Sequence, residues 1–414
     1  MISFGRVAAR TATLTALLVA GVSCSDDTSS PPPSAETEPQ TAEPSPSAEA
    51  DGEPESSTAS TEPSIGPTEP PIERTDPTES STEPTNDTAM APRVIIDTDL
   101  GGDPDDIQSL IRAIHYSDVL RIEGIVSTQG AGDGKPWLIR EWIRRTDVDH
   151  LRGLGYEELT AEERLLAGVR TGTQRLRPPS PDGTSDGSQH IIERARAGSP
   201  DDPLWLLAWG SLGTIAQALH DDPSIVDRVR IYSIGDYNTR SNEAARDFVF
   251  DMLDEHPDLW WIENGVLPLE SRSTFRGVWR GGEQSGQWNR EEFVDRHIRG
   301  HGTDADGRFD EVLGDAFPLA NSPREAIGSL KEGDSPSLLY LLSPQLGGPG
   351  DLDDPTGPSW GGRFRLADDS FPNYYVDLDC DDKDDCQATI NRHRVAYLSH
   401  WRDRWDRYDT PADE

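Results

Sequence analysis

Apolar residues in this chain gather in short continuous runs, separated by polar segments and turn residues. A continuous apolar run with such boundaries is typical of a buried strand. The pattern predicts strands at Arg93–Asp97, Arg121–Thr128, Leu204–Trp209 and Val229–Ile234.

Between these runs, apolar residues recur every three or four positions, which is the period of an amphipathic helix. The predicted helices include Pro104–Tyr116, Lys135–Arg145, Gln189–Ala197, Leu212–His220 and Ser335–Leu342. Stretches rich in Gly, Pro and Asp predict loops at Arg177–Gly187 and Gly347–Pro358. Strands that alternate with helices indicate βαβ units, so we expect an α/β fold, a mostly parallel open sheet with helices on both faces.

The first 24 residues combine Arg6 and Arg10 with an apolar stretch that ends at Ser23-Cys24. The stretch is too short to span a membrane and resembles the signal peptide of a bacterial lipoprotein. We therefore expect export to the cell envelope with a lipid on Cys24, the only contact with a membrane. Simple secretion without the lipid is the alternative.

Residues 25–90 are rich in Ser, Thr, Pro and Glu and contain almost no apolar residues. They cannot bury enough surface to offset the entropy of ordering, so we predict a disordered linker. A single folded domain is expected over 91–414. The formal net charge of −38 argues against nucleic acid as a partner.

Five aspartates follow the apolar run Val94-Ile95-Ile96 within ten residues: Asp97, Asp99, Asp103, Asp105 and Asp106. The carboxyl end of a strand is where open α/β sheets bind ligands. The last three alone are compatible with ordinary capping of the next helix, but the first two are not explained by capping. So many like charges indicate a bound cation, and oxygen donors suit Ca²⁺ better than Zn²⁺, which prefers His and Cys.

Residues 94–106, VIIDTDLGGDPDD, resemble the signature of nucleoside hydrolases, in which Asp-x-Asp is followed by a Gly-containing loop and Asp-Asp. The longer loop is similar to that of the nucleoside-hydrolase-like domain of bacterial secreted proteins described as cellulose-binding. Three further stretches fit that branch: 203–214 (PLWLLAWGSLGT), 332–340 (EGDSPSLLY) and 358–364 (PSWGGRF). The resemblance extends from Arg93 to Trp405 and implies a nucleoside-hydrolase-like fold.

The resemblance also implies a calcium site. Asp99 matches a calcium ligand that contacts the metal-bound water and removes its proton. Asp106 matches the main calcium ligand, and Asp334 matches the last acidic ligand. Trp209 falls where the family binds calcium through a backbone carbonyl. For Asp334, a plain helix N-cap is the alternative.

Substrate contacts are implied at other positions. Asp105 matches the residue that holds sugar hydroxyls, and Asp97 matches a further acid of the same site. Asp236 and Asn242 fall where nucleoside hydrolases place polar sugar-binding residues. Trp360 is a candidate for stacking on a base or sugar ring, as are Trp209, Trp260 and Trp261, although a single Trp is more often part of the core.

The implied chemistry is cleavage of a bond at an anomeric carbon. Calcium activates a water, Asp99 accepts its proton, and single displacement inverts the anomeric carbon. The chain is thus expected to be a calcium-dependent hydrolase of a glycosidic bond, in particular an N-glycosidic one. Its ligand is a small sugar, a nucleoside-like molecule or a polysaccharide. Gly333 stands where some nucleoside hydrolases carry a His, so the leaving-group acid stays unassigned.

Two alternatives belong to other classes. The first is a non-catalytic, calcium-dependent carbohydrate-binding protein that keeps the pocket without turnover. The second is a phosphatase of the haloacid-dehalogenase type, because Asp97-Thr-Asp99 and Gly235-Asp236 resemble its motifs. The phosphatase leaves Asp105, Asp106 and Asp334 without a role.

Cys380 and Cys386 bracket a short acidic segment. In an exported protein this spacing favours a local disulfide. Asp377, Asp379 and Asp381 have the alternating spacing of a calcium loop, but Asp382 replaces the glycine that its sharp turn requires.

Overall fold

The computed structural model describes residues 90–101, 104–128, 135–173, 177–235, 237–265, 281–302, 307–317, 330–378 and 383–409. The predicted signal peptide with Cys24, the linker up to residue 89, Asp103, Asp236, Asp379, Cys380 and Asp381 lie outside the described residues, and so does the side chain of Cys386. Among the helices that are described, none is both long and apolar enough to cross a membrane.

The described strands form one sheet in the order β3-β2-β1-β4-β5-β6-β8-β7. All neighbours run parallel except β7 and β8, which form an antiparallel pair at one edge. The strands are β1 Arg93–Thr98, β2 Arg121–Ser127, β3 Val169–Thr171, β4 Leu204–Ala208, β5 Val229–Ile234, β6 Trp260–Asn264, β7 Phe364–Leu366 and β8 Tyr374–Asp377. The prediction of a mostly parallel open sheet is confirmed.

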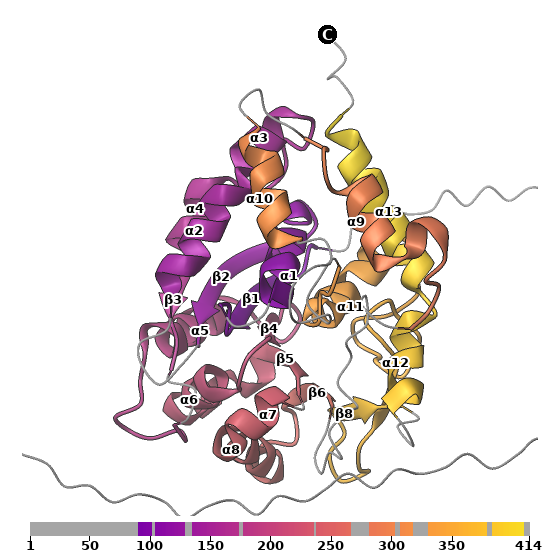
Figure 1. Cartoon of the computed structure of the whole chain (residues 1–414). Helices are drawn as coiled ribbons and strands as arrows, with labels where there is room; N and C mark the ends of the chain where they lie inside the picture. Colours follow the sequence, from indigo (N-terminus) through magenta and orange to yellow (C-terminus); the bar gives the residue numbers. More distant parts are fainter. Residues whose placement is uncertain are drawn as a thin grey trace, which may run out of the picture. The chain divides into compact units, whose positions relative to one another are not determined.

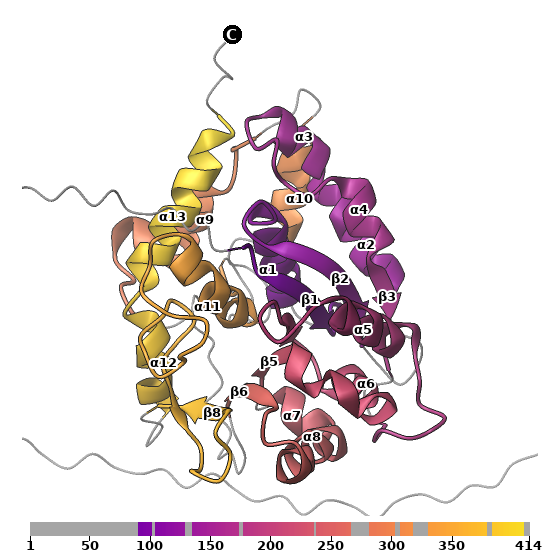
Figure 2. The same ribbon diagram turned by 180° about the vertical axis from the view of Figure 1, so that it is seen from behind.

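Helices cover both faces of this sheet (Figures 1 and 2). The helices are α1 Pro104–His115, α2 Pro136–Thr146, α3 Val148–Gly153, α4 Glu162–Ala167, α5 Asp186–Ala197, α6 Gly213–Asp221, α7 Tyr237–Ser241, α8 Glu243–Glu255, α9 Arg290–His297, α10 Arg308–Ala316, α11 Ser335–Gln345, α12 Lys383–Asn391 and α13 Arg394–Arg407. Two short 3-10 helices span Pro223–Arg228 and Gly286–Trp288.

The alternation of side chains along β1 divides the core into two layers. Val94 and Ile96 are fully buried in the layer that includes apolar residues of α1, α2, α11 and α13. Ile95, which points to the other face, is buried with residues of α5, α6 and α8. Because both faces of β1 are covered, its sequence is a continuous apolar run rather than an alternating one.

The predicted strands correspond to β1, β2, β4 and β5, and the predicted helices to α1, α2, α5, α6 and α11. The structure adds β6, which begins at Trp260 and Trp261, two residues that we considered as possible ring-stacking positions. Trp260 is 7% exposed and Trp261 is 0% exposed, so both residues belong to the buried core.

His115, at the end of α1, gives the fold a dependence on pH. Its ring is fully buried against Trp405, with centroids 4.3 Å apart, and its nitrogens have no hydrogen-bond partner among the described residues. Burial, with help from Arg404 and Arg112, lowers the pKa of His115 well below its ordinary value.

We expect His115 to make the protein less stable in acid. The unfolded chain takes up a proton below about pH 6.5 and the folded chain does not, so stability is full above that pH and falls as pH decreases. Urea titrations at several pH values measure how the free energy of unfolding falls as the pH decreases. His115→Leu should make this fall less steep by up to about 1.4 kcal/mol per pH unit. An unchanged slope would show that the folded protein protonates His115 as readily as the unfolded chain does.

Candidate functional site

The acidic cluster lies at the carboxyl end of β1, where the chain turns into α1. Asp97 is the fifth residue of β1, Asp99 follows the strand, and Asp105 and Asp106 open the first turn of α1. Acidic residues suit this turn because the free N–H groups of a helix N-terminus favour negative charge. Asp105 and Asp106 are nevertheless buried, with 6% and 4% exposed.

Asp334 joins this cluster from a distant part of the chain. It directly precedes α11, and its carboxylate, with those of Asp105 and Asp106, offers oxygen atoms that all lie within 4.8 Å of one another. Asp334 occupies the N-cap position of α11, but its side chain makes no capping hydrogen bond. The plain N-cap alternative therefore lacks its defining interaction.

The neighbouring carboxylates disfavour a negative charge on Asp106. Burial raises the pKa of Asp106 well above its ordinary value, and the carboxylates of Asp334, Asp99 and Asp105 raise it further. The hydroxyl of Thr98 donates a hydrogen bond to Asp106 and opposes this shift. Among the described residues, the Thr98 hydroxyl thus offsets only part of the effect that burial and the neighbouring carboxylates have on the pKa of Asp106.

Asp97 is the most enclosed carboxylate of the cluster, with 1% exposed. Neither of its oxygens has a hydrogen-bond partner of normal geometry among the described residues. Burial raises the pKa of Asp97 well above its ordinary value; the nearby Thr214 hydroxyl opposes the shift, and Asp99 adds to it. A buried carboxylate without a partner is costly unless it is protonated or near a cation.

Asp99 is half-buried beside the turn after β4. A Cβ on Gly210 would lie 3.0 Å from the Cβ of Asp99 and 2.9 Å from the Thr128 hydroxyl oxygen. Gly210 therefore lets the chain after β4 approach the cluster closely, because a larger residue would displace Asp99.

Polar side chains of α1 hold the segment that carries Asp334. The Gln108 side-chain oxygen accepts hydrogen bonds from the backbone N–H groups of Lys331 (2.7 Å) and Glu332 (3.1 Å). Arg112 donates two hydrogen bonds to Glu332, at 2.6 and 2.7 Å, and both side chains are fully buried. Glu332 adopts a left-handed backbone with φ of 46°, a conformation that non-glycine residues rarely adopt. We refer to Gln108, Arg112 and Glu332 as the α1 clamp.

Lys331 is a residue of the site that the sequence reasoning missed. Its Nζ lies 3.4 Å from Oδ2 of Asp105, and only 6% of Lys331 is exposed. The sequence signal was its place three residues before Asp334. On its own, a lysine at that spacing indicates nothing, because the pairing depends on the α1 clamp.

Trp209 lies between the cluster and α11. Its backbone N–H donates to the carbonyl of Asp97 (2.8 Å), and its indole N–H donates to the Ser337 hydroxyl (2.8 Å). The carbonyl of Trp209 accepts a hydrogen bond from the Asn238 side chain at 2.8 Å. Because a carbonyl oxygen has two lone pairs, metal ligation by Trp209 stays a prediction.

The two remaining described candidates for substrate contact have structural partners. Asn242 caps α8 by accepting from the backbone of Ala245 (3.3 Å), and its amide donates to the carbonyl of Arg177 (3.2 Å). Trp360 is 5% exposed within the main core and packs near His400. A role in substrate binding stays a prediction for both, with no open ring face on Trp360 to support stacking.

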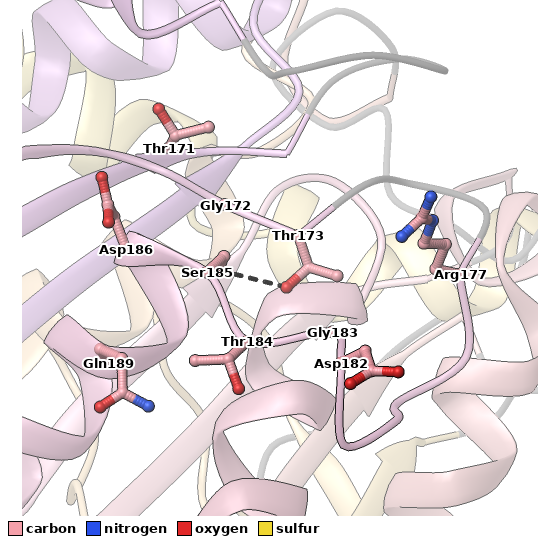
Figure 3. A pocket seen from close by; sticks show the side chains of 10 residues that line it. All are labelled: Thr171, Gly172, Thr173, Arg177, Asp182, Gly183, Thr184, Ser185, Asp186 and Gln189. Atoms are coloured by element: carbon pink, nitrogen blue, oxygen red, sulfur yellow. Dashed lines mark hydrogen bonds between the residues drawn. The ribbon is translucent and has the colours of Figure 1, made fainter.

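A polar cavity of about 510 Å³ lies at the carboxyl end of β3 (Figure 3). It is lined by Thr171, Gly172, Thr173, Arg177, Asp182, Gly183, Thr184, Ser185, Asp186 and Gln189. The Thr214 hydroxyl accepts a hydrogen bond from the backbone N–H of Thr173 (3.0 Å), one of the lining residues, and it also lowers the pKa of Asp97. Thr214 thus connects Thr173, which lines the cavity, with Asp97.

Comparison with known proteins agrees with this architecture. Residues 93–364 match the family described as "Cellulose-binding Sde182, nucleoside hydrolase-like domain". No curated protein matches the sequence.

Similar solved structures are related to nucleoside hydrolases. One is a nucleoside hydrolase-related hypothetical protein from Saccharophagus degradans, associated with carbohydrate metabolism, with 21% identity, 78% of this chain and 72% of that chain covered, and a TM-score of 0.55. Another is the purine-preferring ribonucleoside hydrolase from Gardnerella vaginalis, with 14% identity, 74% and 99% covered, and a TM-score of 0.38. The first likeness supports the fold; at such low identity neither transfers an activity.

Proposed function

Because the chain belongs to the cellulose-binding, nucleoside-hydrolase-like family matched by residues 93–364, we propose that it is a calcium-dependent hydrolase of glycosidic bonds. The observation that carries the proposal is the convergence of Asp106 and Asp334, 228 positions apart in sequence, beside Asp97 and Asp99. A chain gains nothing in stability from gathering buried like charges, so their convergence indicates a bound cation.

The donor set fits calcium. The group formed by Asp105, Asp106 and Asp334 contains carboxylates only, and Ca²⁺ takes six to eight oxygen ligands whereas Zn²⁺ prefers nitrogen and sulfur. Asp97, whose oxygens accept no hydrogen bond of normal geometry among the described residues, and Asp106, whose pKa is raised, both support a cation that would balance their negative charge. Asp99, Asp106 and Asp334, with the Trp209 carbonyl, are the proposed ligands.

Each carboxylate then has a distinct task. When bound, a divalent cation would lower the pKa of a water molecule and orient it. Asp99, half-buried at the edge of the cluster, accepts the proton of the attacking water, and Asp105 orients the sugar hydroxyls. Asp97 supplies negative charge behind them and helps to stabilise the oxocarbenium-like transition state. Attack from this one side predicts inversion at the anomeric carbon.

Calcium is expected to stabilise the folded protein. Since only the folded chain gathers Asp106 and Asp334, calcium at 100 times its Kd should add about 2.7 kcal/mol to the free energy of unfolding. Differential scanning calorimetry with calcium and with a chelator measures the shift in Tm. Asp106→Asn should abolish most of the shift, whereas an identical Tm in calcium and chelator for the wild type would argue against the site.

Non-catalytic carbohydrate binding is a second candidate, favoured by a groove between α2 and α10. Trp137 is 59% exposed in this groove, whose volume is about 560 Å³ and which Glu141, Arg144 and Glu311 also line. An exposed Trp face flanked by charged hydrogen-bonding groups suits a sugar ring. Trp137→Ala should weaken retention on a cellulose column, whereas Trp137→Phe, which keeps an aromatic ring, should not. If both variants are retained as well as the wild type, the groove no longer supports carbohydrate binding.

Attachment to a membrane through Cys24 is also proposed, supported by the basic start, the short apolar stretch and the Ser23-Cys24 junction. One acyl chain binds membranes only marginally, so stable attachment requires the several chains of a lipoprotein. Cys24→Ser should move the protein from the membrane fraction to the soluble fraction. Mass spectrometry that finds an unmodified N-terminus downstream of Cys24 would contradict the anchor.

A further inference from the structure

The polar cavity at the carboxyl end of β3 is lined by a loop that α6 holds in place (Figure 3). Gln217 of α6 accepts a hydrogen bond from the backbone N–H of Ser180 (3.1 Å) and donates one to the Ser180 carbonyl (2.8 Å). A Cβ on Gly183 would collide with the side chain of Gln217, so the loop packs closely against the helix. The Thr184 hydroxyl donates to Asp221 of α6 at 2.8 Å. The loop is therefore fixed before a ligand binds, which lowers the entropy cost of binding.

Two other contacts fix the rest of the lining. The side chain of Asn242, a buried residue, donates a hydrogen bond to the carbonyl of Arg177 at 3.2 Å. The hydroxyl groups of Thr173 and Ser185 lie 3.2 Å apart and share a hydrogen bond (Figure 3). Ser185 is also the N-cap of α5, and Thr173 is 4% exposed. The cavity thus has a built framework that joins the ends of β3, α5 and α8.

The lining combines hydrogen-bond donors with acceptors. Asp182 and Asp186 offer acceptors, Arg177 offers donors, and the amide of Gln189 offers both. The two carboxylates disfavour a phosphate or another anion, and the group of described residues that could hold a metal contains neither of them. None of the lining residues is aromatic, so a nucleobase would find no ring on which to stack. A neutral ligand with several hydroxyl groups fits this lining, because each hydroxyl both donates and accepts.

The cavity and the acidic cluster lie at the same end of the sheet. Thr98 of β1 is in register with Ser127 of β2, and Ser127 is in register with Thr171 of β3. Since neighbouring strands lie about 4.8 Å apart, the lining residue Thr171 is about 10 Å from Thr98. The backbone N–H of Gly172 donates to the Ser127 carbonyl at 2.8 Å, so the alignment continues into the cavity lining. A ligand that reaches both places must extend across two strand spacings.

We propose that this cavity is a second sugar-binding subsite, which holds one unit of an oligosaccharide while the glycosidic bond of a neighbouring unit lies at the acidic cluster. The inference rests on the proposed function and narrows its substrate from any glycoside to a chain of sugar units. Arg177, Asp182, Asp186 and Gln189 are the proposed contacts. Because one chain then occupies two linked subsites, its affinity increases with length until both are filled.

The test measures how affinity depends on the number of sugar units. An array of glucan, xylan and mannan oligosaccharides of one to six units identifies the sugar, and calorimetric titration of that series in calcium gives each Kd. For the wild type, Kd should fall at least about tenfold between one unit and three. Gln189→Trp fills the cavity from an exposed position on α5 and should abolish this gain without changing the Kd of one unit. Asp182→Ala should weaken binding of three units about tenfold, because a hydrogen bond to a charged group is lost.

Glu193→Ala is the matched control, since Glu193 is exposed on the same helix but does not line the cavity. It should keep the wild-type gain, and circular dichroism verifies that every variant folds. Two results would overturn the inference while the proposed function stands. In one, the wild type binds or cleaves single-sugar glycosides but gains no affinity for longer chains; in the other, Gln189→Trp keeps the full gain. If the wild type neither binds nor cleaves any sugar or glycoside, the inference and the proposed function both fail.

Discussion

Replacing Arg112 by methionine is expected to lower the free energy of unfolding by about 3–5 kcal/mol, because it leaves the buried Glu332 carboxylate without its cation. Arg112 and Glu332 are each fully buried and share two short hydrogen bonds. The guanidinium also lies 3.8 Å from the centre of the Trp401 ring, so the change removes packing as well. Urea unfolding monitored by circular dichroism gives the difference.

A surface pair provides the matched control. Arg296 and Glu292 are also within bonding distance (2.7 Å), but their side chains are 57% and 49% exposed. Arg296→Met should cost less than about 1 kcal/mol, because solvent screens an exposed pair. The double variant Arg112→Met with Glu332→Leu should recover part of the loss, since no unpaired charge remains. A loss below 1 kcal/mol for Arg112→Met alone would contradict the role of the α1 clamp.

Replacing Asp99 by asparagine is expected to lower turnover about 10²-fold or more, because the amide keeps an oxygen for the cation but cannot accept a proton. The affinity for sugar should change far less. Measurement of kcat and KM on a substrate of the wild type separates the two effects. Full turnover in Asp99→Asn would exclude Asp99 as the general base.

Asp105→Ala serves as a comparison for Asp99→Asn. A residue that holds substrate hydroxyls contributes through orientation, so its loss should affect both KM and kcat. Losing kcat alone in this variant would assign Asp105 to proton transfer instead.

The parts of the fold predicted from sequence were those with strong local patterns. β1 and α1 were clear because an apolar run ends in aspartates and an apolar face follows. β3 and β7 have three residues each, and β8 has four, which is too short for periodicity to identify. Their positions depend on pairing with strands that lie far away in sequence.

For the candidate site, too, the sequence predicted some residues and not others. Asp97 to Asp106 were found because they are adjacent in sequence, and Asp334 was found only through the resemblance to nucleoside hydrolases. The α1 clamp was not predicted, because its contacts join residues 220 and more positions apart. No local pattern marks Glu332 as the buried partner of Arg112, and the pairing of Lys331 with Asp105 depends on that contact.

The most direct test of the proposed function is the release of free sugar from a broad panel of nucleosides and other N- and O-glycosides. We predict that calcium-loaded wild type releases sugar with inverted anomeric configuration, that a chelator stops the release, and that Asp99→Asn is at least about 10²-fold slower. No release from any glycoside, with sugars still bound equally by wild type and Asp99→Asn, would contradict catalysis and favour a carbohydrate-binding protein.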